Sequence, residues 1–234
     1  MADRRRVVFC TPCLSRPTNP YLAALEDCLP AVEAAGWDHA AVFETSNPYI
    51  SGARAKLLRK AMDSKPDAVV FLDYDLSWRP SDMVALLEAD GDVVAGTYRF
   101  KMPKVEYMGG WEPDASGRPK CRADGAIEAW RVPAGFLKVT AQAVDKFMRA
   151  YPELVYGERY NPAVDLFNHG AIGGVWYGED YAFSKRWIEA GEKLWLLPDL
   201  SITHHAGDEA FPGNLHEFLL REPGGSKEGV PYGE

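Results

Sequence analysis

Two aspartates separated by one residue directly follow a short apolar run. The run is Ala68 to Leu72, and the acids are Asp73 and Asp75. An unbroken apolar run of this length, rich in Val, indicates a strand buried on both faces, as in a parallel sheet. Side chains two positions apart on an extended chain point to the same side, so we expect both carboxylates to converge where the strand ends. Such oxygens are ligands for Mg²⁺ or Mn²⁺, whose shells are often completed by substrate phosphates.

The two aspartates have a simpler interpretation as helix caps or residues of a solvated turn. The segment from Arg79 to Asp82 has the features of a helix start, with Pro80 near the first turn. Because this start lies several residues beyond Asp75, neither acid of the pair is needed as its cap. Ligands of open α/β sheets bind beyond the carboxyl ends of the strands, and we therefore place the site here.

Composition and net charge restrict the kinds of protein and ligand that fit this sequence. The chain has 234 residues, of which 47% are hydrophobic and 26% charged, as in an ordinary globular protein. Its net charge of −8 gives no general attraction to nucleic acid or to anionic membranes, so a phosphate-bearing ligand requires a metal or local positive charge. Arg99 and Lys101 are candidates for that charge, or are simply surface residues. The N-terminal sequence does not resemble a signal peptide and no apolar stretch is long enough to span a membrane, so we expect a cytoplasmic location.

Strands and helices are predicted to alternate over the first hundred residues. Predicted strands cover residues 6–10, 39–43, 68–72 and 92–96, and helices open at Asn19, at Ser51 as a cap, and at Pro80. This order favours βαβ units, and hence an α/β fold with a mixed, mostly parallel central sheet flanked by helices.

The second half of the chain is less regular. Residues 101–130 indicate loops with a hairpin, and residues 132–139 a strand interrupted by Gly135, where close approach of a ligand or backbone is expected. Helices are predicted from Thr140 and from Glu179, and late strands over 194–197 and 201–205. From residue 208 to 234, Gly, Pro and charged residues dominate, which predicts a C-terminal tail or lid.

These motifs together resemble the glycosyltransferases of the GT-A fold, and among them the broad family-2-like group of inverting enzymes. The resemblance covers about residues 5–207 and is carried by Ser51-Gly-Ala-Arg54, the Asp-x-Asp pair, Gly178-Glu-Asp-Tyr-Ala-Phe183 and His205-Ala-Gly207. It implies a Rossmann-like GT-A catalytic domain over residues 1–207. The nucleotide-binding half would span about 1–100 and the acceptor half about 101–207.

The resemblance implies a metal-dependent, hexosyltransferase-like enzyme. It would move a sugar from a UDP-, GDP- or dTDP-sugar to an acceptor hydroxyl, with inversion. Negative charge develops on the departing nucleoside diphosphate, and Mn²⁺ or Mg²⁺ stabilises such charge. A glycan, a lipid-linked sugar or a small molecule is the expected acceptor, while a DNA base is disfavoured by the net charge of −8.

The family pattern assigns roles in the donor half. Asp73 would contact the ribose or base, and Asp75 the metal. Arg54 would lie near the diphosphate or base, and Thr11 and Pro12 would border the nucleobase.

The family pattern also assigns roles in the acceptor half and in the metal shell. Asp180 would be the general base, and Glu179 an acceptor-site or orienting group, although acids in the first turn of a helix often serve only its dipole. His205 aligns with the His that often completes the metal shell. Because neighbouring strand residues point to opposite faces, only one of His204 and His205 should reach the site, and His204 stays open. A histidine hydrogen-bonded in the core is the alternative for both.

Three other classes of protein remain open. Cys10-Thr-Pro-Cys13 follows a strand and precedes a helix, as in a thioredoxin-like redox pair. A nucleotidyltransferase also uses a metal on an α/β sheet, but the segment after the first strand is a poor phosphate loop. The third is a sugar-nucleotide-binding module without catalysis.

Overall fold

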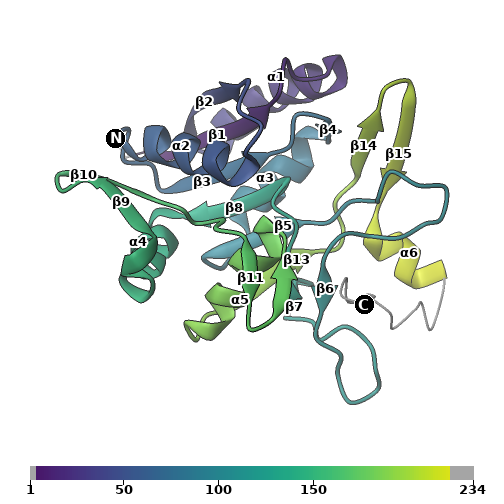
Figure 1. Ribbon diagram of the computed structural model, residues 1–234. Coiled ribbons are helices and arrows are strands. Elements are labelled where there is room, and N and C mark those ends of the chain that lie inside the picture. Colours follow the sequence, from purple (N-terminus) through teal and green to yellow (C-terminus); the bar gives the residue numbers. More distant parts are fainter. Residues whose placement is uncertain (1–3, 222–234) are drawn as a thin grey trace.

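The computed structural model describes residues 4–221 (Figure 1). Its centre is an eight-stranded sheet with the order β2-β1-β3-β8-β5-β13-β7-β6. The strands are β1 (Arg5–Cys13), β2 (Trp37–Thr45), β3 (Ala68–Leu72), β5 (Val93–Gly96), β6 (Gly110–Trp111), β7 (Ile127–Arg131), β8 (Phe136–Thr140) and β13 (Leu194–Leu197). β7 and β8 run antiparallel to their neighbours, and the other strands share one direction. The predicted mixed, mostly parallel sheet is confirmed.

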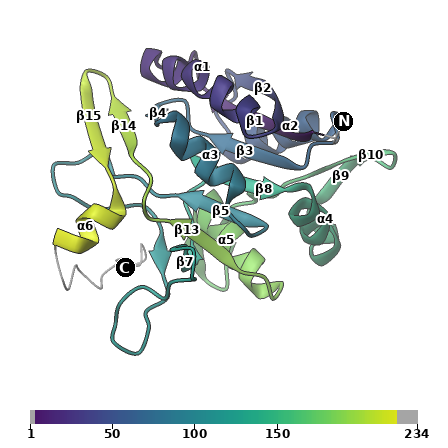
Figure 2. The same cartoon turned by 180° about the vertical axis from the view of Figure 1, so that it is seen from behind.

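Helices cover both faces of this sheet. One face packs against α1 (Asn19–Ala34) and α3 (Pro80–Glu88), which lie in front in Figure 2. The other face packs against α2 (Ile50–Met62), α4 (Ala141–Ala150) and α5 (Glu179–Glu189). The alternation of side chains along the central strands divides the core in two, so that Val69 and Phe71 belong to one cluster and Val70 to the other. β3 is buried at every position, as its apolar sequence predicts.

Smaller elements surround the sheet. β14 (Ile202–Ala206) lies between β4 (Leu76–Ser77) and β15 (Glu209–Gly213) in a three-stranded sheet. Two hairpins project from the body (Figure 1), and a short 3₁₀ helix and α6 complete the fold. Their bounds are β9 (Val155–Glu158), β10 (Asn161–Val164), β11 (Gly170–Ile172), β12 (Val175–Tyr177), η1 (Pro152–Leu154) and α6 (Leu215–Arg221). No helix within residues 4–221 combines the length and apolar character that crossing a membrane requires.

The structure differs from the predicted elements in three places. The strand expected over 132–139 is shorter than predicted, because β8 begins only after Gly135, the residue at which an interruption was expected, and residues 132–135 lie between it and the end of β7. Ser51 lies inside α2 and does not cap it. The first part of the segment expected to be a tail or lid belongs to the folded body, since β15 pairs with β14 and Leu215 is fully buried. The rest of that segment, residues 222–234, lies outside the described residues.

Candidate functional site

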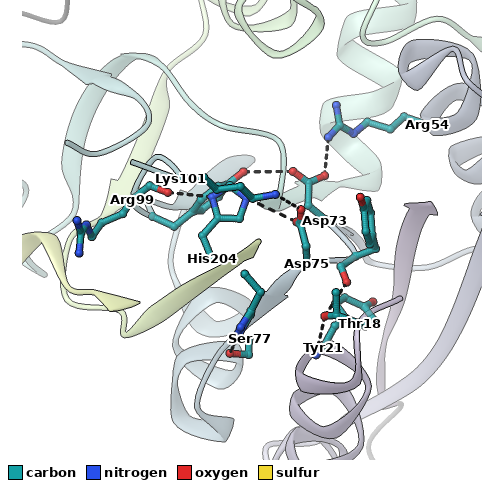
Figure 3. A network of polar contacts seen from close by, with 12 residues as sticks. Thr18, Tyr21, Arg54, Asp73, Asp75, Ser77, Arg99, Lys101 and His204 are labelled. Atoms are coloured by element: carbon teal, nitrogen blue, oxygen red, sulfur yellow. Dashed lines mark hydrogen bonds and ion pairs between the residues drawn. The ribbon is translucent and has the colours of Figure 1, made fainter. Parts of the chain in front are cut away.

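The Asp-x-Asp segment is a turn anchored on two sides. β3 ends at Leu72, and the backbone N–H of Leu76 donates to the Asp73 carbonyl at 3.2 Å. Thr18, the N-cap of α1, donates to the Tyr74 carbonyl from its N–H at 3.0 Å and from its hydroxyl at 3.2 Å. Because this segment turns, the rule for extended chains does not apply, and the carboxylates of Asp73 and Asp75 contact different partners (Figure 3).

Arg54 connects Asp73 to the first turn of α5. Its Nη2 lies 2.8 Å from Asp73 Oδ1, and its Nη1 lies 2.8 Å from Glu179 Oε1. The residue is only 2% exposed. Burial alone would lower the pKa of Arg54, but the two carboxylates raise it above its ordinary value, so the guanidinium stays charged. The arginine predicted near the diphosphate thus joins the Asp-x-Asp segment to a residue that lies 125 positions after the arginine itself.

The opposite side of Asp73 is closed by Tyr98 and Gly135. The Tyr98 hydroxyl donates to Asp73 Oδ2 at 3.3 Å, and the Asp73 N–H donates to the Gly135 carbonyl at 2.8 Å. A Cβ atom at Gly135 would overlap both the Tyr98 hydroxyl and the Asp73 carboxylate. Close approach at this glycine was predicted, but the approaching groups are these two side chains.

Asp75 lies in a separate cationic environment. One of its carboxylate oxygens, Oδ2, contacts Lys101 Nζ, and the other, Oδ1, lies 3.6 Å from His204 Nε2. Burial alone would raise the pKa of Asp75, but hydrogen bonds with His204 and Lys101 lower it below its ordinary value. Asp75 is therefore an ionised carboxylate with two nitrogen groups beside it.

The two adjacent histidines of β14 have different surroundings. His204 Nδ1 lies 2.9 Å from the Arg99 carbonyl, which can only accept, so Nδ1 carries a proton, and Nε2 is the ring nitrogen that faces Asp75. His205 instead lies with its Nε2 2.8 Å from Ser77 Oγ, while its backbone N–H donates to the Asp75 carbonyl at 2.8 Å. The imidazole that reaches the Asp75 carboxylate is that of His204, whereas the family pattern pointed to His205.

Asp75 and His204 are placed to supply two of the ligands of one divalent cation. Metal-bound histidines commonly donate their second ring N–H to a carbonyl, as His204 does. Two ligands of one ion, each at about 2.1 Å, lie at most about 4.2 Å apart, which accommodates the 3.6 Å between Asp75 Oδ1 and His204 Nε2. Residues 4–221 contain no group of three or more potential metal ligands. Mn²⁺ or Mg²⁺ bound here would thus take its remaining ligands from a phosphate-bearing substrate and water.

Asp180 occupies the first turn of α5 beside Glu179. Its side chain is half-buried, and its Oδ1 accepts from the Tyr181 N–H at 2.8 Å. Burial, and then the negative charges of Glu179 and Asp73, raise the pKa of Asp180 to about 7, against the opposing effect of Arg54. A carboxylate with such a pKa can take a proton near neutral pH and release it again.

The end of β1 carries the residues expected beside a nucleobase. Thr11 and Pro12 are both buried, and the Thr11 hydroxyl contacts that of Tyr21. The next residue but one, Leu14, is 62% exposed, and Tyr49, just before α2, is 73% exposed. Leu14, and Phe43 of β2, which pairs with Thr11 and is 37% exposed, thus offer accessible apolar surface at this end of β1.

The two cysteines of the Cys-x-x-Cys segment are poorly placed for redox chemistry. Cys10 and Cys13 lie within β1 and are buried. Burial raises the pKa of both thiols above the ordinary value, which opposes formation of the reactive thiolate.

The hairpin that precedes α5 presents an aromatic surface. Trp176 on β12 is 67% exposed, and its ring packs edge-on against His169 at 6.0 Å. His169 Nδ1 lies 3.1 Å from Ser51 Oγ, which connects the hairpin to α2. The aromatic content of this region was visible in the sequence. The contact between Ser51 and His169 was missed, as was that between Tyr98 and Asp73, because no local pattern marks either pair.

A cavity of about 880 Å³ borders the elements that hold the partners of Asp75. Its lining includes Ser77, which contacts His205, and Arg99, whose carbonyl accepts from His204. Aromatic side chains of Trp78, Tyr107 and Phe218 also line it. The cavity therefore combines cationic and aromatic surface next to β14.

Comparison with known proteins finds similarity at the level of solved structures. No family model and no curated protein matches the chain. GalNAc-T7 with UDP, GalNAc and Mn²⁺ gives a TM-score of 0.47 and 12% identity, over 87% of this chain and 44% of that one. A mutant of Drosophila β1,4-galactosyltransferase 7 with manganese, UDP-Gal and xylobiose gives 0.46 and 12%, over 93% and 74%. A glycosyltransferase involved in glycosylating the major capsid of PBCV-1 gives 0.36 and 10%, over 63% and 65%.

All three of these structures are of glycosyltransferases, and the chain spans less than half the length of the first. At such identities and TM-scores, what this chain does must be inferred from its own residues.

Proposed function

We propose that this protein is a metal-dependent glycosyltransferase that moves a sugar from a nucleotide-sugar donor to an acceptor hydroxyl with inversion. The observation that carries the proposal is the double ion pair of Arg54 with Asp73 and Glu179. It brings the Asp-x-Asp turn next to the carboxylates of Glu179 and Asp180 in the first turn of α5. A group that handles the leaving diphosphate and a group that handles the incoming hydroxyl thus lie at one edge of the sheet.

The donor half of the proposed site is built around Asp75. Asp75 and His204 would hold Mn²⁺ or Mg²⁺, and the ion supplies stabilisation of the negative charge on a departing diphosphate. Asp73 is held by Arg54 and Tyr98, and would contact the ribose or base of the donor. UDP-, GDP- and dTDP-sugars all suit such a site.

The acceptor half depends on Asp180. A pKa of about 7 lets this carboxylate remove the proton of an acceptor hydroxyl as the oxygen attacks the anomeric carbon. Attack from the face opposite the diphosphate inverts that carbon. Glu179 is paired with Arg54 and is therefore assigned a positioning role. The exposed ring of Trp176 suits stacking on a glycan, on a lipid-linked sugar or on another small acceptor.

This proposal treats residues 1–207 as one catalytic domain with a nucleotide-binding half and an acceptor half. A nucleotidyltransferase would need a cationic phosphate loop after β1, where the structure has the buried Thr11 and Pro12 and the exposed Leu14. A module that only binds sugar nucleotides would have no need of the raised pKa of Asp180, because a base is required only for transfer.

Calorimetry with UDP-, GDP- and dTDP-sugars, with and without Mn²⁺, tests the donor half. We expect one nucleotide to bind only when the metal is present, and Asp75→Asn and His204→Ala to abolish that binding. His205→Ala should retain the site, because His205 contacts Ser77 and not the Asp75 carboxylate. Asp63→Asn removes an exposed carboxylate on another part of the surface and serves as the control. Donor affinity unchanged by EDTA would refute metal dependence.

A further inference from the structure

Lys101 contacts one of the two carboxylate oxygens of Asp75, the residue proposed to bind the metal through the other oxygen. Its Nζ contacts Asp75 Oδ2, from a segment held by the backbone hydrogen bond of Phe100 N–H to the Glu106 carbonyl at 3.0 Å. The Lys101 side chain is 35% exposed, whereas that of Asp75 is 12% exposed. The ammonium of a partly exposed side chain therefore contacts a nearly buried carboxylate, and Figure 3 marks this contact with a dashed line.

An ammonium on one oxygen of Asp75 and a divalent cation on the other would lie only a few ångströms apart. A metal about 2.1 Å from a carboxylate oxygen carries two positive charges, which would repel the ammonium strongly across so short a distance. The lysine side chain is a flexible four-carbon stem, and its partial exposure leaves it room to swing away. Release of Asp75 by Lys101 therefore removes this repulsion and strengthens metal binding there.

A nucleoside diphosphate would give the released ammonium a new partner. Phosphate oxygens accept charge-assisted hydrogen bonds from lysine, and those of a diphosphate held at Asp75 would lie within reach of a side chain anchored two residues after Arg99. Such a ligand replaces the ion pair that Lys101 loses when it releases Asp75. A metal that binds without nucleotide provides no replacement.

We propose that Lys101 is a positioning residue that makes metal binding depend on the nucleotide. In the absence of nucleotide it holds Asp75 and weakens binding of a divalent cation. When a nucleoside diphosphate is present, Lys101 moves to the phosphate oxygens and Asp75 becomes free to bind the metal. The two ligands then favour each other's binding through one side chain. This inference rests on the proposed function and adds the order in which the donor half assembles.

The test measures binding of manganese(II) alone, by the loss of the free-ion signal in electron paramagnetic resonance. Lys101→Met removes the competing cation and keeps the length of the side chain, so we expect it to tighten binding of Mn²⁺ about tenfold over the wild type. Lys101→Arg keeps a cation and should bind Mn²⁺ weakly, like the wild type. Lys104→Met is the matched control, because it removes one positive charge from the same segment without touching Asp75; its ammonium pairs with Glu106 and is 77% exposed.

The outcomes separate this inference from the proposed function. Tighter binding in Lys101→Met, but not in Lys104→Met, supports the inference. Equal binding by the wild type and Lys101→Met, lost in Asp75→Asn, would overturn the role of Lys101 and leave the metal site in place. Equal tightening in both lysine variants would reduce the effect to general charge and overturn the inference. Binding that is absent throughout, or that is insensitive to Asp75→Asn, would overturn the metal site as well.

Discussion

Asp180→Asn should stabilise the fold at alkaline pH. The substitution keeps the size of the side chain and its ability to accept the Tyr181 N–H, but removes the charge. The pKa of Asp180 is raised from its ordinary value of 3.8 to about 7, so the folded state binds a proton that the unfolded chain has already released. Between these two values the folded state therefore loses stability as pH rises, and the full cost is present above pH 7. Asparagine does not titrate and carries no such cost.

The size of the effect follows from the two pKa values. Each tenfold difference in proton affinity between the folded and unfolded states changes the unfolding free energy by about 1.4 kcal/mol, once the pH lies above both pKa values. At pH 5 only part of this cost is present, because Asp180 is still protonated in the folded state. The difference in unfolding free energy between Asp180→Asn and the wild type should therefore grow by about 2.5 kcal/mol from pH 5 to pH 8, in favour of the variant.

Urea denaturation of both proteins at several pH values measures this growth. Effects of the amide on packing are the same at every pH and cancel in the comparison, as do the titrations of distant groups. A difference that stays constant from pH 5 to pH 8 would refute a raised pKa at Asp180. Asp75→Asn should instead destabilise the fold by a constant amount from pH 5 to pH 8, and this difference should shrink only as the pH falls below about 4, because the pKa of Asp75 is lowered from its ordinary value of 3.8.

The same substitution should remove catalysis. Without the base we expect turnover to fall at least about a hundredfold, with donor affinity little changed. In the wild type, kcat/KM should rise with pH through a value near 7, since the deprotonated form is the active one. Loss of donor binding in Asp180→Asn would make this residue structural, and full activity would transfer the role of base to Glu179.

Three further variants test the packing around the site and the role of the two cysteines of β1. Gly135→Ala introduces a Cβ that overlaps Tyr98 and Asp73, so it should lower the unfolding free energy by about 1 to 3 kcal/mol and weaken donor binding, as measured by urea denaturation and calorimetry. Gly52→Ala, whose new Cβ meets only ordinary contacts within α2, should stabilise by about 0.5 to 1 kcal/mol; equal effects of the two would contradict the packing around Gly135. Replacing Cys10 and Cys13 together with Ala should leave transfer within an order of magnitude, and activity that requires a reductant in the wild type would instead favour redox chemistry.

The central sheet was predictable because its main strands are each marked by a local sequence pattern. β3 coincides with its apolar run, and β13 with the predicted strand over 194–197. The alternation of strand and helix then leaves few arrangements for the first hundred residues. The strand predicted over 132–139, with an interruption at Gly135, is present only after that glycine, because the apolar residues before Gly135 do not show that the chain there is not extended into the sheet.

The side-chain contacts of Asp73 and Asp75 were less predictable, because they depend on the path of the turn that contains both residues. Asp73 and Asp75 were expected to converge on the assumption that the chain stays extended past Leu72. The hydrogen bonds of Thr18 to the Tyr74 carbonyl instead hold this segment as a turn, and a cap of α1 that lies 56 residues earlier leaves no trace beside the motif. Choosing between His204 and His205 likewise depends on which face of β14 meets Asp75, and two adjacent histidines do not reveal it.

Burial, and after it the excess of negative charge at this edge of the sheet, raises the pKa of Asp180. Three carboxylates, those of Asp73, Glu179 and Asp180, surround the single guanidinium of Arg54. Asp73 and Glu179 take its two terminal nitrogens, and Asp180 makes no ion pair within residues 4–221. The unpaired acid is the one whose pKa rises to about 7. The basicity that transfer requires and the stability lost at alkaline pH thus have one cause. A variant that supplied Asp180 with its own cation would strengthen the fold and weaken the base by the same interaction.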